Sequence, residues 1–340
     1  GDHFGEVIWA KHPSQFKIGD RYYFSDATKS EYSLFAKLNY NLSSKWKAFV
    51  DLQGRFVNFK TQGLSSKIFE LDVDKNFSFF NPKLGLSYQL SPESQFYVSY
   101  AKAHREPNRQ DFEEDINTAE ELDDIELGWR FQKNNFALSS NLYYMYYQNQ
   151  LVLTGEMDNS GRPVRMSSGK SYRLGLELDM SWQLHKNFSW MANATLSTNK
   201  HKDFVMDWDG ELTNFGDTDL SFSPRLVASN MLVYSPMSDL SFGLLSKYVG
   251  SQYMGNTQTK AAKLDAYTVS DLQMQYSLSD FLFTEKTTFS VLVNNIFDKK
   301  YSSNGFYYTF DDDYTTPGVI STQEGAGYYP QAGINFLVGI

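Results

Sequence analysis

The 340-residue sequence predicts an all-β fold, and more narrowly an antiparallel transmembrane β-barrel with about fourteen strands. Three observations predict it: apolar and polar residues alternate with period two, the alternating segments are long, and short and long connections follow one another in turn. Successive side chains of a strand point to opposite faces, so this alternation gives one apolar and one polar face. Short periplasmic turns and long extracellular loops are the pattern of outer-membrane barrels.

The composition agrees with this class and excludes several others. Aromatic residues make up 16% of the chain and the mean hydropathy is −0.47, and no apolar run approaches the roughly 18 residues of a transmembrane helix. Disordered chains are poor in aromatic residues, so disorder is excluded as well. The absence of Cys excludes a disulfide framework and a thiolate metal site. A net charge of −9 argues against a nucleic-acid partner.

The alternation is clearest in residues 31–41, 83–90 and 171–182. The apolar set of the last segment is Tyr172, Leu174, Leu176, Leu178, Met180 and Trp182. This segment is about twice as long as the ~5–6 residues of a typical soluble strand. A tilted strand that crosses a bilayer needs roughly 9–11 residues, so a spanning strand fits better. Residues 225–234 alternate poorly, and residues 6–10 form the weakest of the fourteen predicted strands.

The connections between these segments fall into two classes that alternate along the chain. Short polar turns are predicted near residues 41–45, 91–94, 133–135, 185–187, 235–239 and 279–286. Longer loops are predicted near residues 11–29, 61–76, 105–118, 154–165, 203–219, 252–263 and 299–327. This asymmetry predicts that all short turns lie at one end of the barrel and all long loops at the other.

Aromatic residues gather near the predicted strand ends. They are Tyr22, Tyr23, Trp46, Trp129, Tyr143, Tyr144, Tyr146, Tyr147, Trp182, Trp190 and Tyr234. Barrels place such rings in girdles at the two membrane interfaces. A soluble β-sandwich alternates as well, with its apolar face inward, and period alone leaves this alternative open. Strand length, loop asymmetry and aromatic placement together favour the barrel.

Five segments carry a family resemblance. They are 97–112 (YVSYAKAHREPNRQDF), 217–224 (DTDLSFSP), 247–276 (KYVGSQYMGNTQTKAAKLDAYTVSDLQMQY), 294–305 (NNIFDKKYSSNG) and 328–340 (YYPQAGINFLVGI). In this order they resemble the C-terminal part of the β-barrel of TonB-dependent outer-membrane receptors, especially those of the Bacteroidetes group. The resemblance implies a plug domain followed by a 22-stranded barrel. It therefore implies that residues 1–340 are the C-terminal part of such a barrel, without the plug and the first strands.

The sequence has few features typical of enzymes, and the chain is not expected to be an enzyme. No nucleophile elbow, zinc-protease motif or phosphate-binding glycine loop occurs, and no catalytic residue, metal ligand or cofactor is predicted. The carboxylates 113–115 fit a solvated loop better than a glycosidase pair. Residues 311–313 and 207–211 offer oxygen ligands of the kind that Ca²⁺ prefers, although loop solvation is the default interpretation.

The candidate ligand-binding residues lie on two predicted extracellular loops. The first group is His104, Arg105, Glu106 and Arg109, which mixes both charges with a histidine next to a strand end. The resemblance places a haem-contacting motif near this region in haem receptors, but the match here is loose. The alternative for this group is that its charges pair with one another and brace the loop. The second group is Tyr307, Tyr308 and Tyr314 on the long final loop, and an ordinary mobile loop is the alternative there.

The polar faces carry charges of both signs, at Lys37, Glu126, Arg130, Arg173, Glu177, Asp179 and Lys247. A charge facing lipid costs roughly 2–4 kcal/mol at the midplane, so these residues should face the lumen. The resemblance implies that many of them contact the plug.

The expected function is the uptake of a scarce nutrient, such as a ferric siderophore, haem, cobalamin or glycan, across the outer membrane of a Gram-negative bacterium. The partners are membrane lipid, the small-molecule or glycan ligand and, only through the missing plug, TonB. Two alternatives remain open: a passive fourteen-stranded porin and a soluble all-β carbohydrate-binding protein.

Overall fold

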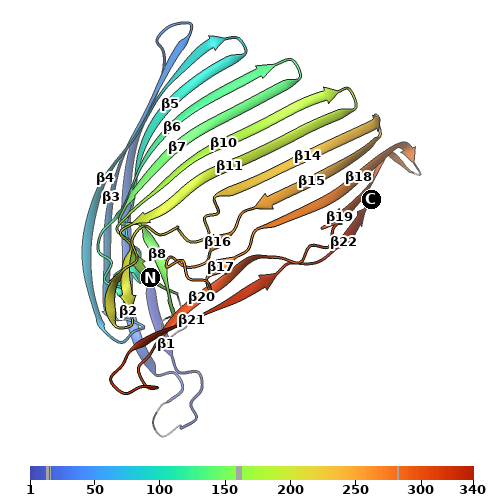
Figure 1. Cartoon of the computed structure of the whole chain (residues 1–340). Helices are drawn as coiled ribbons and strands as arrows, with labels where there is room; N and C mark the ends of the chain where they lie inside the picture. Colours follow the sequence, from blue (N-terminus) through green and yellow to red (C-terminus); the bar gives the residue numbers. More distant parts are fainter. Residues whose placement is uncertain (13–14, 16, 158–162, 282) are drawn as a thin grey trace.

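The computed structural model describes residues 1–12, 15, 17–157, 163–281 and 283–340. Fourteen strands form one antiparallel sheet, which curves into an open trough with β1 and β22 as its two edges (Figure 1). The strands are β1 Asp2–Glu6, β2 Arg21–Asn41, β3 Trp46–Leu64, β4 Glu70–Ser91, β5 Ser94–Arg105, β6 Glu120–Lys133, β7 Phe136–Gln148, β10 Lys170–His185, β11 Phe188–Lys202, β14 Leu226–Met237, β15 Leu240–Val249, β18 Tyr267–Phe281, β19 Thr284–Asn294 and β22 Asn335–Gly339. The predicted fold class is confirmed.

Four small hairpins and one short helix lie in the long connections. They are β8 Leu151–Met157 with β9 Pro163–Ser167, β12 Val205–Trp208 with β13 Glu211–Asn214, β16 Gln252–Tyr253 with β17 Lys263–Leu264, β20 Ser302–Asp312 with β21 Ser321–Pro330, and α1 Arg109–Glu113. Figure 1 shows the tight turns at one end of the sheet and these insertions at the other. The predicted placement of short turns at one end and long loops at the other is therefore confirmed, although the connection between β3 and β4 is also short. No helix in the described residues is long and apolar enough to cross a membrane.

Some predicted boundaries are wrong. The first strand is residues 2–6 rather than 6–10, because Phe4 pairs with Phe24 in register. The predicted loop 61–76 shrinks to residues 65–69, because β3 and β4 stay paired as far as Leu64 and Glu70. The poorly alternating segment 225–234 lies almost wholly in β14, which pairs with β11 and β15. Residues 13, 14, 16, 158–162 and 282 belong to the predicted connections 11–29, 154–165 and 279–286 and lie outside the described residues.

The apolar face of the sheet is exposed. Leu34 on β2 keeps 73% of its surface accessible, and Leu174 and Leu178 on β10 are exposed as well. A β-sandwich would bury this face against a second sheet. In the described residues the other sheets are two-stranded hairpins of the loop end, and none forms such a second layer. The apolar band therefore faces outward, as in a membrane barrel.

An aromatic belt follows the short-turn end of the outer face. It consists of the ring contacts Trp46–Tyr88, Phe96–Trp129, Trp129–Phe131, Phe131–Phe136 and Phe136–Trp182, with centroid distances of 4.6, 6.3, 6.0, 6.2 and 5.8 Å. Tyr144 and Tyr172 make a similar contact of 6.2 Å nearer the other end. The distance along β10 from Tyr172 to Trp182 is about 33 Å at ~3.3 Å per residue. A strand tilted by ~40° then rises about 25 Å, the height of the apolar band in outer-membrane barrels.

On the inner face, two glycines make room for rings from the neighbouring strand. A Cβ on Gly128 would lie 2.0 Å from the ring of Tyr97, and one on Gly175 would lie 2.4 Å from Tyr143. Each pair is in direct register, so each tyrosine ring lies flat on the strand beside it. The hydroxyl group of Tyr97 donates to Asn141 over 3.0 Å and holds the ring there. Because these rings lie flat on the sheet, they leave space above its concave face.

Candidate functional site

The connection between β5 and β6 folds back over the concave side of the trough. Asn108 caps α1, and its side chain and that of Asp111 exchange hydrogen bonds with each other's backbone amides. Phe112 on the helix stacks on Phe59 of β3 at 5.1 Å, and Asp111 lies 3.4 Å from Arg165 of β9. The helix therefore joins the tall β3 strand to the β8–β9 hairpin.

The candidate residues on this connection do not pair with one another in the described structure. Arg105 pairs with Glu120 at 3.4 Å, and Arg109 with Glu113 at 2.7 Å. Arg109 also donates to Ser25 of β2 over 2.9 Å. These charges therefore brace the connection, but not by pairing with one another: Arg105 pairs with Glu120 of β6, and Arg109 contacts Glu113 of α1 and Ser25 of β2.

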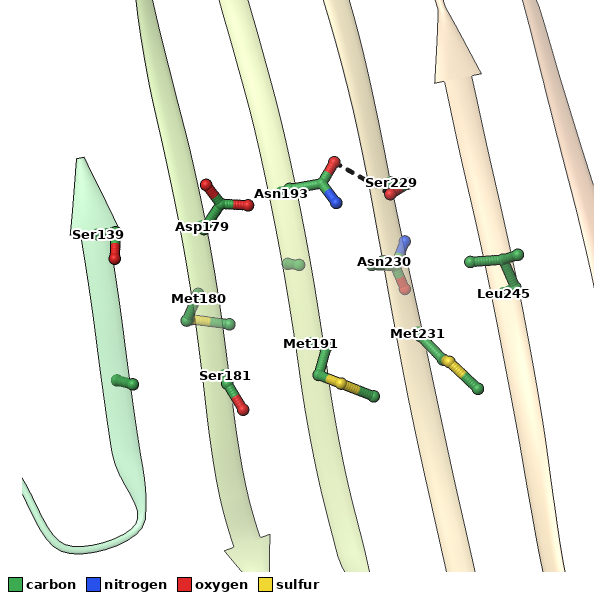
Figure 2. A pocket seen from close by; sticks show the side chains of 12 residues that line it. Ser139, Asp179, Met180, Ser181, Met191, Asn193, Ser229, Asn230, Met231 and Leu245 are labelled. Carbon is green, nitrogen blue, oxygen red and sulfur yellow. Dashed lines mark hydrogen bonds between the residues drawn. The ribbon is translucent and has the colours of Figure 1, made fainter. Parts of the chain in front are cut away.

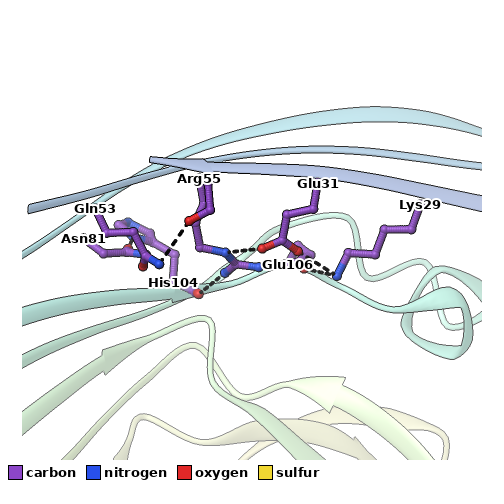
Figure 3. Close-up of polar contacts among 8 residues, drawn as sticks. Lys29, Glu31, Gln53, Arg55, Asn81, His104 and Glu106 are labelled. Atoms are coloured by element: carbon purple, nitrogen blue, oxygen red, sulfur yellow. Dashed lines mark hydrogen bonds and ion pairs between the residues drawn. The ribbon is translucent and has the colours of Figure 1, made fainter. Parts of the chain in front are cut away.

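Glu106 is the centre of a latch made of Glu106, Lys29, Arg55 and Glu31 (Figure 3). Its carboxylate accepts from Lys29 Nζ at 2.6 Å and from Arg55 Nη2 at 3.2 Å, and only 9% of the side chain is exposed. Arg55 also bonds to Glu31 at 2.9 Å. Burial opposes ionisation of Glu106, but the hydrogen bond from Lys29 and the charge of Arg55 lower its pKa below the ordinary value. The latch fixes the β5–β6 connection to β2 and β3.

His104 faces the wall of the sheet. Its Nδ1 lies 2.7 Å from Asn81 Oδ1, and its ring stacks on Phe79 at 5.0 Å (Figure 3 shows Asn81 beside it). Glu121 lies 3.9 Å from the other ring nitrogen. Sequence analysis missed Lys29 and Arg55 as partners of this region, because 77 and 51 residues separate them from Glu106 and no local pattern links them.

The three candidate tyrosines of the final loop have different surroundings. Tyr307 is 8% exposed and packs with Met254, Ala262 and Leu264, and its hydroxyl group donates to Glu324 over 2.9 Å. Tyr308 is partly exposed and covers Gly325. Tyr314 is 75% exposed. Tyr307 therefore holds the hairpins together, whereas Tyr308 and Tyr314 are accessible from outside.

The acidic loop segments meet between hairpins. Asp209 Oδ1 accepts from the amide of Thr322 over 2.6 Å, and the hydroxyl group of Thr322 donates to Asp311 over 2.7 Å. These bonds join the β12–β13 hairpin to the β20–β21 hairpin. Asp312 accepts from two backbone amides of its own turn. Among the described residues, no three or more His, Asp and Glu side chains form a group that could hold a metal ion.

The charges of the spanning strands form a polar wall, defined here as Glu126, Arg130, Arg173, Glu177 and Asp179. Arg130 and Asp179 both pair in register with Ser139, which places them on the same face. In the part of the chain that the structure describes, none of the five has an opposite charge within 4.0 Å. Arg130 and Arg173 instead lie over the rings of Tyr97 and Tyr147, at 5.1 and 5.7 Å.

Two shallow cavities lie on this face. Figure 2 shows the first, of about 450 Å³, where Asp179, Asn193 and Ser229 adjoin Met191 and Met231. The second has a volume of about 370 Å³ and is lined by polar-wall residues and by a loop, through Glu126, Arg173, Glu177, Phe222 and Pro224. The polar face therefore offers unpaired charge beside open space.

An open sheet with an apolar outer band, a charged inner face and interlocked hairpins at one end defines part of an outer-membrane type of barrel. The chain belongs to the family described as TonB-dependent receptor-like β-barrels, whose sequence model matches residues 8–296.

Curated relatives are similar over part of their length. The ferrioxamine receptor of Yersinia enterocolitica is 26% identical over 256 residues, which cover 74% of this chain and 34% of that protein. The metal-pseudopaline receptor CntO of Pseudomonas aeruginosa is 25% identical, over 66% of this chain and 30% of that protein. The chain thus spans about a third of the length of these relatives.

Solved structures share the fold. The siderophore receptor PiuA from Acinetobacter baumannii aligns with a TM-score of 0.71 at 17% identity, covering 92% of this chain and 43% of that one. The copper transporter OprC aligns with a TM-score of 0.70 at 17% identity, covering 98% of this chain and 50% of that one.

Proposed function

We propose that this chain forms the ligand-receiving part of an outer-membrane receptor of a Gram-negative bacterium, which imports a scarce nutrient with energy supplied through TonB. The observation that carries this proposal is the division of one sheet into an exposed apolar band and a charged concave face beneath interlocked hairpins. Two relatives are named as receptors for ferrioxamine and metal-pseudopaline. A metal chelate is therefore the favoured cargo over haem, cobalamin or a glycan.

In the whole receptor, other parts of the protein would contact the two open edges of the sheet and the polar wall. Additional strands would pair with β1 and β22 and complete a 22-stranded barrel. A plug domain would fill the lumen, pair with Arg173 and Glu177, and carry the contact with TonB. The resemblance carried by the run Asn294–Gly305 favours a receptor of the Bacteroidetes type.

Within the loops, we assign ligand contact to the accessible side chains of the candidate set, which are Arg105, Tyr308 and Tyr314. His104, Glu106 and Arg109 act by positioning the loops, because their polar atoms already have partners in the described structure, and the hydroxyl group of Tyr307 is bonded to Glu324.

The test uses the full-length protein in cells with and without TonB. We expect iron accumulation from at least one member of a panel of ferric siderophores to depend on both the receptor and TonB. Accumulation that persists without TonB would identify a passive porin. A protein that is extracted without detergent, and whose mobility on gels is the same before and after heating, would be a soluble binding protein.

A further inference from the structure

A small pocket lies among the hairpins of the loop end, apart from the cavities of the polar wall. Its volume is about 120 Å³, and its walls include Glu156 of β8, Phe222, Met254, Phe306 and Tyr307. These five residues define the hairpin pocket. They come from four separate connections, which the tertiary fold brings together around one space.

The aromatic walls of the hairpin pocket are fixed by their surroundings. Tyr307 is packed against Met254 and bonded to Glu324, and Phe306 stacks on Tyr308 at 6.1 Å. Phe222 has a φ of 51°, a left-handed conformation that is rare for a bulky residue. Its amide donates to Tyr253 over 2.7 Å and holds it there. Strained backbone of this kind is concentrated at ligand clamps and active sites.

Glu156 brings negative charge to this space. Among the described residues no cation pairs with its carboxylate. Burial, followed by the charges of Asp311, Asp207 and Glu114, raises the pKa of Glu156. Among the described residues, Lys67 opposes this shift, and its ammonium group is already bonded to Glu114 at 2.6 Å. Within the described residues, the pocket therefore combines a carboxylate that has no paired cation with the faces of aromatic rings.

We propose that the hairpin pocket binds an organic ammonium group, so that the imported ligand carries a positively charged amine. Aromatic cages attract cations through the ring quadrupole, and a carboxylate adds direct charge attraction. Residues 203–219 of the adjoining connection hold six acidic residues. Asp217 and Asp219 pair with Lys202 and Lys200, and the other four have no cation within 4.0 Å among the described residues, so an anionic ligand would be repelled there. The inference rests on the proposed function and specifies its ligand class.

The experiment is a titration of the full-length protein in detergent micelles with tetramethylammonium chloride, followed by ligand-observed NMR. tert-Butyl alcohol serves as an uncharged probe of similar shape. Glu156→Gln removes the charge and keeps the shape of the side chain, while Glu211→Gln removes an exposed carboxylate from a neighbouring hairpin outside the pocket. Phe306→Leu and Phe310→Leu form a second matched pair, because only Phe306 lines the pocket.

We expect the wild-type protein to bind tetramethylammonium and not the alcohol, and Glu156→Gln and Phe306→Leu to weaken binding at least roughly tenfold, with both controls unchanged. Thermal unfolding of each variant shows whether the hairpins remain folded. Equal binding of the cation and the alcohol, or binding that is unaffected by Glu156→Gln, would overturn the proposal. The titration needs neither TonB nor transport, so its failure is distinguishable from failure of the proposed function.

Discussion

The loop end and the polar wall differ in how their charged side chains are paired. At the loop end, charges from distant segments pair closely, as in Lys29–Glu106, Lys67–Glu114 and Lys102–Glu121 at 2.6, 2.6 and 3.0 Å. On the polar wall, Glu126, Arg130, Arg173, Glu177 and Asp179 have no counter-ion among the described residues. These charges of the loop end therefore find partners within this chain, whereas Glu156 of the hairpin pocket pairs with no cation among the described residues. The wall presents charges beside open cavities.

The largest effect is expected from breaking the latch with Glu106→Gln. The change leaves Arg55, which is mostly buried, without one of its carboxylates. Losing one partner of a buried pair costs about 3–5 kcal/mol, and partial exposure of Lys29 reduces this to about 2 kcal/mol. Faster hydrogen exchange in residues 106–119 of the full-length protein would show the loss.

The matched control for the latch is Asp74→Asn, which breaks the exposed pair with Lys60. Exposed pairs contribute about 0–1 kcal/mol, so exchange in residues 106–119 should stay as in the wild type. Equal effects of the two substitutions would contradict the central position of Glu106.

The next largest effect is expected from Gly128→Ala on the wall. The added Cβ displaces the ring of Tyr97 and breaks its bond to Asn141, and overpacking of this kind costs about 1–3 kcal/mol. Gly54→Ala is the control, because its nearest neighbour would be a side-chain carbon of Phe56 at 3.6 Å. Thermal unfolding should separate the two variants, and a Gly128→Ala protein as stable as Gly54→Ala would show that the ring moves freely.

The pH dependence separates two carboxylates of the loop end. The pKa of Glu106 is lowered, so the latch stabilises the fold above the ordinary value of 4.5 and weakens only as the pH falls further. The pKa of Glu156 is raised, since burial and the carboxylates of Asp311, Asp207 and Glu114 outweigh Lys67. As the pH falls, tetramethylammonium binding should therefore weaken at a higher pH than the pH at which hydrogen exchange in residues 106–119 becomes faster. Loss of both together would contradict this assignment.

The smallest effect is expected from Glu177→Gln, which tests whether another part of the receptor pairs with the charges of the polar wall. In a receptor whose plug pairs with Glu177, the substitution should lower the unfolding free energy of the full-length protein by about 1 kcal/mol. A change within about 0.5 kcal/mol, typical of surface positions, would show that the wall charge stays solvated.

The sequence by itself determined the fold class, the number of main strands and, in the clearly alternating segments, which residues share a face of the sheet. Alternation in residues 171–182 and the succession of short and long connections were sufficient, because strand geometry ties period two directly to the two faces. The resemblance of residues 294–305 identified the family, which the match over residues 8–296 confirms. Strand ends were less predictable, because β3 and β4 extend by pairing with each other.

Only the tertiary structure decided what the candidate residues do. Glu106 meets Lys29 and Arg55 because the β5–β6 connection folds over β2 and β3, and no local pattern records a contact across 77 residues. Tyr307 and Glu156 meet for the same reason, since their hairpins are joined by packing and not by sequence proximity. The unpaired state of Arg173 and Glu177 likewise depends on where neighbouring strands and loops place their charges. Long-range contacts create these sites. Residue type and spacing could therefore indicate candidate residues, but could not predict which of them lie together.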